Sequence, residues 1–123
     1  MKELSTIVEF YAERVEAAIE GKLYNVNGEY EVDPQTVTDE MEQVDLFEYL
    51  QAKGLGDIRF EISISGELTG GKTLLAFGGP TVWLHDNKLC GCWGAETKEL
   101  YFSLDVRNHL FGYFQELYET IRK

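Results

Sequence analysis

The sequence predicts an α+β fold, in which an antiparallel meander sheet of four or five strands is packed on one face by three helices. A long segment at each end of the chain has apolar residues at every third or fourth position, which is typical of amphipathic helices. Between them, short apolar runs alternate with turn residues, which is typical of antiparallel strands. The predicted order is helix, small hairpin or loop, helix, four or five strands, helix. A chain of 123 residues fits a single domain, residues 1–123.

The first helix is predicted over residues 3–21, where Gly21 is a typical end signal. Its outer face carries four glutamates that follow one another at intervals of three or four positions, and Arg14 offsets little of their charge. Its apolar stripe contains Leu4, Ile7, Val8, Tyr11, Val15, Ala18 and Ile19. The glutamates are Glu9, Glu13, Glu16 and Glu20.

Residues 24–32 contain the strongest hairpin signal of the chain, Asn27-Gly28 between two short runs with apolar and aromatic residues. A small hairpin and an ordered loop both satisfy this pattern, so the conformation of residues 24–32 stays open. Asp33-Pro34 ends the segment, because a residue before proline favours an extended backbone.

The second helix is predicted over residues 38–53, with Thr36 or Thr38 as its cap and Gly54 as its end. Its apolar stripe contains Met41, Val44, Phe47 and Leu50. Its acidic residues are expected to continue the negative surface of the first helix. Those predicted to bind are Asp39, Glu42 and Asp45.

Residues 57–65 alternate between apolar and polar side chains, which predicts a half-buried strand with Ile58, Phe60, Ile62 and Ile64 on one face. The glycine-rich residues 66–71 are expected to turn into the next strand, residues 72–77. The string Gly70-Gly71-Lys72-Thr73 resembles the end of a phosphate-binding loop, but the first glycine of that motif is displaced and no helix follows. We therefore interpret it as a hairpin loop.

The centre of the sheet is predicted in residues 74–102, where Gly78-Gly79-Pro80 bends the chain between two apolar runs. A two-residue turn at Asp86-Asn87 pairs Leu84 with Leu89 and Val82 with Gly91. On this register one face carries Val82, Leu84, Leu89 and Trp93. The other face carries Thr81, Trp83, His85, Lys88, Cys90 and Cys92.

A last strand is expected around Leu100 and Phe102, followed by a third helix over residues 104–123 with Ser103 or Asp105 as its cap. His109 on this helix is expected to face solvent or to be half-buried, without a catalytic role. The apolar stripe of the helix contains Val106, Leu110, Phe114, Leu117 and Ile121.

The formal net charge of −11 is concentrated in the first half of the chain. Residues 1–53 hold 13 Asp and Glu against 4 Lys and Arg, a balance of −9, whereas residues 54–123 hold 9 against 7, a balance of −2. This distribution argues against direct binding of nucleic acid, which needs a basic surface. It permits a solvated acidic face, or an acidic surface that occupies the basic nucleic-acid groove of another protein.

No apolar run approaches the roughly 20 residues that cross a bilayer, so no membrane contact is expected. The first 21 residues lack an uninterrupted apolar segment and contain several glutamates, unlike a secretion signal. We therefore expect a cytoplasmic protein.

The reactive side chains His85, Cys90 and Cys92 fall on one face of the predicted sheet. Two cysteines two positions apart on a strand point the same way, which is poor geometry for a disulfide, and two thiols fall short of the four ligands of a structural zinc site. His85 could join them at a metal, or could activate a thiolate. We prefer packing of both thiols as small apolar groups, and expect no metal, no cofactor and no catalytic residue.

The same face would present Trp83 and Tyr101 as an apolar strip if helices cover only the opposite face. Such strips mark surfaces for a partner or for self-association. The alternative is that residues 24–32 fold across the strip and bury it.

The last half of the chain combines a Gly-Gly-Pro turn, a strand with an aromatic residue, a Trp-Gly pair, and a closing helix with Glu-Leu-Tyr. The matching residues are Gly78, Gly79, Pro80, Trp83, Trp93, Gly94, Glu116, Leu117 and Tyr118. In this pattern the chain resembles short uncharacterised proteins carried by bacteriophages and conjugative elements of Gram-positive bacteria. The resemblance is to a packing motif, so it implies a mobile-element origin and no mechanism.

Small acidic proteins of such elements are often inhibitors of host defence that occupy the nucleic-acid-binding surfaces of nucleases. The leading hypothesis is therefore a non-enzymatic inhibitor that binds a defence nuclease, or another nucleic-acid-binding protein, through its acidic helical face. The alternative is a protein-binding or regulatory module that uses the sheet face around Trp83 and Tyr101. An enzyme that uses His85 and the two cysteines is the third hypothesis. The sequence predicts no oligomeric state.

Overall fold

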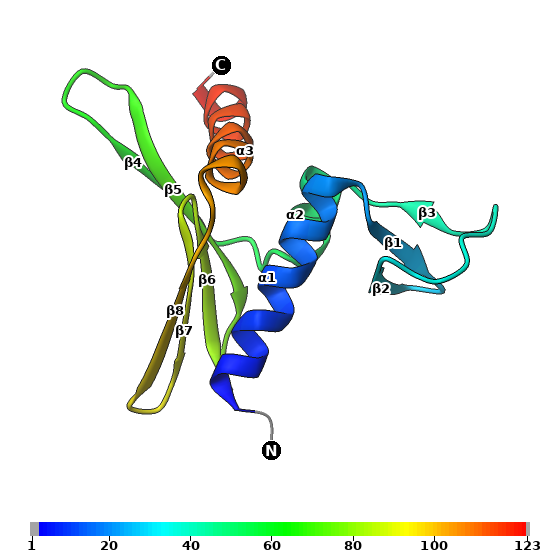
Figure 1. The fold of residues 1–123 in the computed structure, drawn as a ribbon. Coiled ribbons are helices and arrows are strands. Elements are labelled where there is room, and N and C mark those ends of the chain that lie inside the picture. The colour runs from blue at the N-terminus through cyan, green and yellow to red at the C-terminus, as the bar shows by residue number, and fades with distance from the viewer. Residues whose placement is uncertain (1–2, 123) are drawn as a thin grey trace.

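The computed structural model of the protein describes residues 3–122. Within these residues it has three helices and two antiparallel sheets, one of three strands and one of five, which confirms the predicted α+β class. Figure 1 shows the helices on one side of the five-stranded sheet, with the three-stranded sheet farther out, beyond the first helix.

Helix α1 spans Leu4–Glu20, as predicted to within a residue at each end. It ends because Gly21 adopts a left-handed backbone with φ of 77° and donates its N–H to the Ala17 carbonyl. The buried side of α1, which includes Val8 and Val15, packs on the five-stranded sheet, mainly on its last two strands.

The small sheet has the strand order β2-β1-β3, with β1 at Leu23–Val26, β2 at Glu29–Val32 and β3 at Glu42–Gln43. Asn27 and Gly28 form the turn with φ of 53° and 89°, so the hairpin alternative for residues 24–32 is confirmed. This hairpin packs on α1 and lies away from the free side of the five-stranded sheet (Figure 1), so the alternative in which residues 24–32 cover the strip around Trp83 is wrong.

The predicted second helix, residues 38–53, is wrong in its first half, because α2 spans only Leu46–Lys53. Asp45 is the cap instead of Thr36 or Thr38, since its carboxylate accepts a hydrogen bond of 2.8 Å from the Glu48 N–H. The preceding residues follow β1, where the Val44 N–H donates to the Leu23 carbonyl. The backbone N–H and C=O groups of these residues therefore form hydrogen bonds with β1 instead of bonds within a helix.

The five-stranded sheet is a meander in the order β4-β5-β6-β7-β8. Its strands are β4 at Ile58–Ile62, β5 at Leu68–Ala76, β6 at Thr81–His85, β7 at Lys88–Trp93 and β8 at Glu96–Tyr101. The predicted register is confirmed, because Leu84 pairs with Leu89 and Val82 with Gly91. The last strand ends at Tyr101, one residue before the buried Phe102.

Two boundaries in the first hairpin of this sheet differ from the prediction. Strand β4 stops at Ile62, after a bulge at Glu61, and Ile64 is fully exposed in the turn. Strand β5 already begins at Leu68, so Gly70 and Gly71 belong to the strand and not to a loop. A side chain at Gly71 would lie 2.7 Å from the ring of Phe114, which explains the glycine there.

Helix α3 spans Leu104–Arg122, and Lys123, the last residue of the predicted helix, lies outside the described residues. Of its two predicted caps, Ser103 contacts the helix start, since its Oγ lies 3.4 Å from the Val106 nitrogen. His109 is exposed, as expected. The helix packs on β5 through Phe114, so α1 and α3 together cover one sheet face and leave the other uncovered.

Candidate functional site

The first candidate is the row of glutamates on α1, which we call the α1 stripe: Glu9, Glu13, Glu16 and Glu20. All four side chains are exposed, and intervals of three and four residues place them one above the other on a helix. At about 1.5 Å per residue the stripe is roughly 16 Å long.

The charges of the α1 stripe act on one another. Partial burial, and then the carboxylate of Glu20, raise the pKa of Glu16. Lys22 lies 3.5 Å from the Glu20 carboxylate, at the end of the stripe, where both side chains are exposed. The stripe is therefore a line of like charges on a rigid helix.

The other predicted acidic residues are exposed but lie on different elements. Asp39 is in the turn before β3, Glu42 is in β3 opposite Asn25, and Asp45 caps α2. Asp45 lines a shallow cleft with Ala18 and Ile19 of α1. At 100° per residue, position 18 lies opposite the α1 stripe and position 19 lies about 90° from its centre, so Asp45 lies on another side of that helix.

The second candidate is the uncovered face of the five-stranded sheet, which we call the open face. No described helix or strand lies on this side of the sheet (Figure 1). Trp83 is half-buried at its centre, in the middle strand β6. The Arg59 guanidinium lies 5.0 Å and the Lys72 ammonium 4.5 Å from the centre of the Trp83 ring, as in cation–π contacts.

Tyr101 is at the edge of the open face and 58% exposed. Its hydroxyl donates a hydrogen bond of 2.7 Å to the Glu99 carboxylate, which also accepts one of 3.1 Å from the Lys88 ammonium. These two hydrogen bonds lower the pKa of Glu99, and the bond to Glu99 raises the pKa of Lys88. Both groups are therefore charged at neutral pH, and each has a fixed partner.

The register places His85, Cys90 and Cys92 on the open face, as the sequence predicts, and both thiols are free. Burial raises the pKa of the Cys90 thiol, which is the opposite of the shift that a nucleophilic cysteine needs. Burial, Lys72 and Lys88 lower the pKa of His85, so its imidazole is neutral at pH 7. Among residues 3–122, no group of three or more His, Cys, Asp or Glu side chains is arranged to hold a metal ion.

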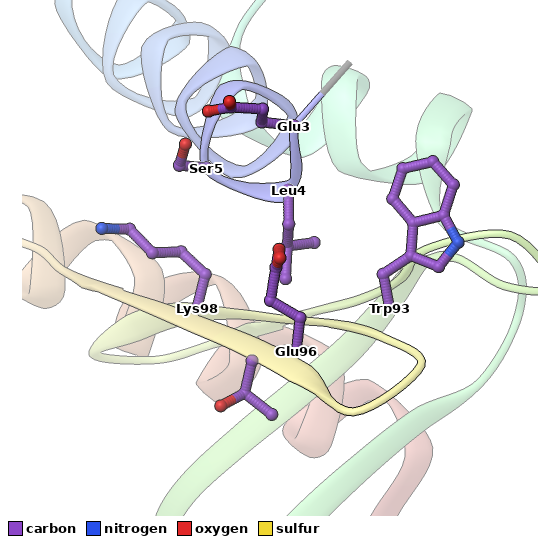
Figure 2. A pocket seen from close by; sticks show the side chains of 7 residues that line it. Glu3, Leu4, Ser5, Trp93, Glu96 and Lys98 are labelled. Atoms are coloured by element: carbon purple, nitrogen blue, oxygen red, sulfur yellow. The ribbon is translucent and has the colours of Figure 1, made fainter. Parts of the chain in front are cut away.

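A cavity of about 540 Å³ lies between the start of α1 and the β7–β8 hairpin. Figure 2 shows Glu3, Leu4 and Ser5 of the helix on one side, and Trp93, Glu96 and Lys98 of the strands on the other. Its charged groups are exposed and of both signs, so water weakens their interactions. The arrangement shows no nucleophile held by a base, and we assign it no reaction.

A smaller cavity that the sequence analysis did not identify lies between α1, the β1–β2 turn and the end of α2. It contains Arg14 and Lys53, which are two of the four Lys and Arg residues in the acidic first half of the chain. The scarcity of cations in residues 1–53 could have drawn attention to Arg14 and Lys53 in the sequence. Their approach depends on where α2 ends relative to the hairpin, which periodicity does not predict.

Comparisons of the chain with protein-family models, with curated proteins and with solved structures find no match. Within residues 3–122, none of the helices has the length and apolar character that spanning a membrane requires.

Proposed function

We propose that the protein acts by binding a nucleic-acid-binding protein, such as a host defence nuclease, through the α1 stripe. The observation that carries this proposal is the alignment of four exposed glutamates along one rigid helix. The mobile-element origin implied by the resemblance of the last half of the chain agrees with it, and the origin is part of the proposal.

The spacing of the α1 stripe supports mimicry of a nucleic-acid strand. Glutamates three or four positions apart are separated by about 4.5–6 Å along the helix axis. A strand of duplex DNA carries one negative charge per roughly 3.4 Å of axis. Over the length of the stripe, the helix therefore presents four charges where a strand presents about five, enough to engage several lysines or arginines of a phosphate-binding groove.

The test is capture of partners with three tagged proteins in parallel, followed by mass spectrometry. The proteins are the wild type, a triple reversal in the stripe, and a control reversal with the same change in net charge. The stripe variant is Glu9→Lys, Glu13→Lys and Glu16→Lys. The control variant is Glu31→Lys, Glu67→Lys and Glu119→Lys, all of them exposed and off the stripe.

We expect a nucleic-acid-binding protein that the wild type and the control retain and that the stripe variant loses. A DNA oligonucleotide should release it, because both ligands occupy one groove. Equal retention by all three proteins, with folding verified by circular dichroism, would remove the α1 stripe from the interface.

A second candidate function is protein binding through the open face. The observation that favours it is the uncovered five-stranded sheet with Trp83 at its centre and Tyr101 at its edge. Aromatic residues and arginine are enriched in protein interfaces, and Arg59 already lies over Trp83. A partner held there should survive elution at high salt and should be lost on Trp83→Ala.

A further inference from the structure

The smaller cavity has a volume of about 280 Å³ and walls from three elements that are distant in sequence. Helix α1 supplies Phe10, Tyr11 and Arg14, the β1–β2 hairpin supplies Gly28, Glu29 and Tyr30, and α2 supplies Lys53 at its end. This volume is just below the range of pockets for drug-sized ligands, so it fits a compact molecule.

Two cations of the cavity are held in place by aromatic rings. The Arg14 guanidinium lies 3.5 Å from the centre of the Phe10 ring and donates a hydrogen bond of 3.2 Å to the Phe10 carbonyl. The Lys53 ammonium lies 5.1 Å from the centre of the Tyr30 ring. In the described part of the chain, neither forms an ion pair with a carboxylate, although residues 1–53 contain 13 acidic residues.

A buried hydroxyl close to the lining of the cavity, which does not open into it, has no partner among the described residues. Tyr49 of α2 is 0% exposed, and its ring packs edge-to-face on Tyr30 at 5.4 Å. Its hydroxyl forms no hydrogen bond with any described residue, which is costly for a buried polar group. Three residues that interact electrostatically with this hydroxyl, Tyr11, Arg14 and Tyr30, all line the cavity.

These groups select the charge of a ligand. Arg14 and Lys53 are hydrogen-bond donors with positive charge, so they favour a negatively charged acceptor, and together they outweigh the one carboxylate of the lining, Glu29. Aromatic walls alone would suit a cationic ligand, but here the cations of the protein itself already occupy the rings of Phe10 and Tyr30 and would repel it.

We propose that this cavity binds a small aromatic carboxylate, with its ring against Tyr11 and its carboxylate between Arg14 and Lys53. The site does not depend on the proposed protein partner. Because its walls come from α1, the hairpin and α2, a bound ligand ties these three elements together and stabilises the folded state.

The test is calorimetric titration of the full chain with benzoate and with indole-3-acetate, each compared with its neutral amide. We expect saturable one-to-one binding of at least one acid with a Kd of about 1 mM or lower, and binding of its amide at least about tenfold weaker. Heat of dilution alone for both acids up to about 10 mM, or equal binding of acid and amide, would overturn the proposal.

Variants separate the site from a general charge effect. Arg14→Gln and Lys53→Gln should each weaken binding of the acid about tenfold, whereas Lys22→Gln, the same charge change outside the cavity, should leave it unchanged. Binding that is insensitive to both Arg14→Gln and Lys53→Gln would place the ligand elsewhere and overturn the assignment.

Discussion

The α1 stripe and the open face lie on opposite sides of one core and are built in different ways. In the stripe, three of the four carboxylates have no ion-pair partner among the described residues, and partial burial and then the charge of Glu20 raise the pKa of Glu16. On the open face, the cations beside Trp83 and Tyr101 have neighbours of their own: Lys88 is bonded to Glu99, and Lys72 lies over Trp83.

This difference shows how each surface would bind. Charges that repel one another in the free protein gain most from a partner of opposite sign, and this gain falls with ionic strength. A surface whose charges are already satisfied gains little from charge and must rely on its apolar area.

The largest effect on the free energy of unfolding is expected at the contact of α1 with β7, which joins the helix of the α1 stripe to the sheet of the open face. A Cβ at Gly91 would lie 2.7 Å from Cγ2 of Val8 and 3.1 Å from Cδ1 of Leu4. Gly91→Ala should therefore lower the free energy of unfolding by about 1–3 kcal/mol, measured by urea denaturation. The control is Gly79→Ala, where nothing lies within 4 Å of the new Cβ, and it should change stability by less than about 0.5 kcal/mol. Equal effects of the two changes would mean that α1 does not rest on Gly91.

The alkylation rate of Cys90 shows which of the two surfaces a partner covers in a complex. Because burial raises the pKa of Cys90, its alkylation by iodoacetamide at pH 7.5 should be several-fold slower than that of a free cysteine, and should accelerate as the pH approaches 9 and above. A partner on the α1 stripe should leave this rate unchanged, whereas a partner on the open face should protect Cys90. Mass spectrometry of timed samples measures the rate, and fast labelling at pH 7.5 would contradict the buried environment.

The contact between Lys72 and Trp83 should appear in a double-mutant cycle. Lys72→Ala and Trp83→Leu, alone and together, are expected to give a coupling of about 0.5–1 kcal/mol in the free energy of unfolding. As a control, Lys98 lines the cavity on the helix side of the sheet and should show no coupling with Trp83. A coupling between Lys72 and Trp83 below the error of the measurement would mean that the cation–π contact does not contribute to stability.

The smallest effect concerns Glu16 of the α1 stripe, where partial burial and then the charge of Glu20 oppose ionisation. The pKa of Glu16 is raised, so the folded state binds this proton more tightly than the unfolded state, and the ionised carboxylate lowers stability at neutral pH. Glu16→Gln should therefore raise the free energy of unfolding at pH 7 by about 0.2–0.5 kcal/mol. The gain should disappear as the pH falls through the usual carboxyl pKa of 4.5, where Glu16 takes up a proton. A lower free energy of unfolding for Glu16→Gln than for the wild type at pH 7 would contradict an unfavourable charge at Glu16.

Local signals predicted the part of the fold whose contacts are local. The Asp86-Asn87 turn set the pairing of Leu84 with Leu89, and with it the face on which Trp83, His85 and the cysteines lie. Asn27-Gly28 did the same for the small hairpin. On α1, helical spacing was enough to place the glutamates of the stripe in one row.

The errors lie where distant contacts override local preference. The spacing of Met41 and Val44 suits a helix. However, residues 42–44 pair with β1, so the helix begins only after its cap, Asp45. Gly70 and Gly71 look like a loop until Phe114 of α3 requires a glycine in the strand. The cavity of Arg14 and Lys53 was missed for the same reason, since its walls meet only in the folded chain.

The most direct test of the central claim is the salt dependence of affinity for the captured partner. The Kd of the wild type and of a Trp83→Ala, Tyr101→Ala variant should be measured between about 0.05 and 0.3 M NaCl. Binding through the α1 stripe predicts that both proteins bind equally well and that both weaken at least about tenfold over this range. Affinity that is independent of salt and lost in the variant would contradict the claim and move the interface to the open face.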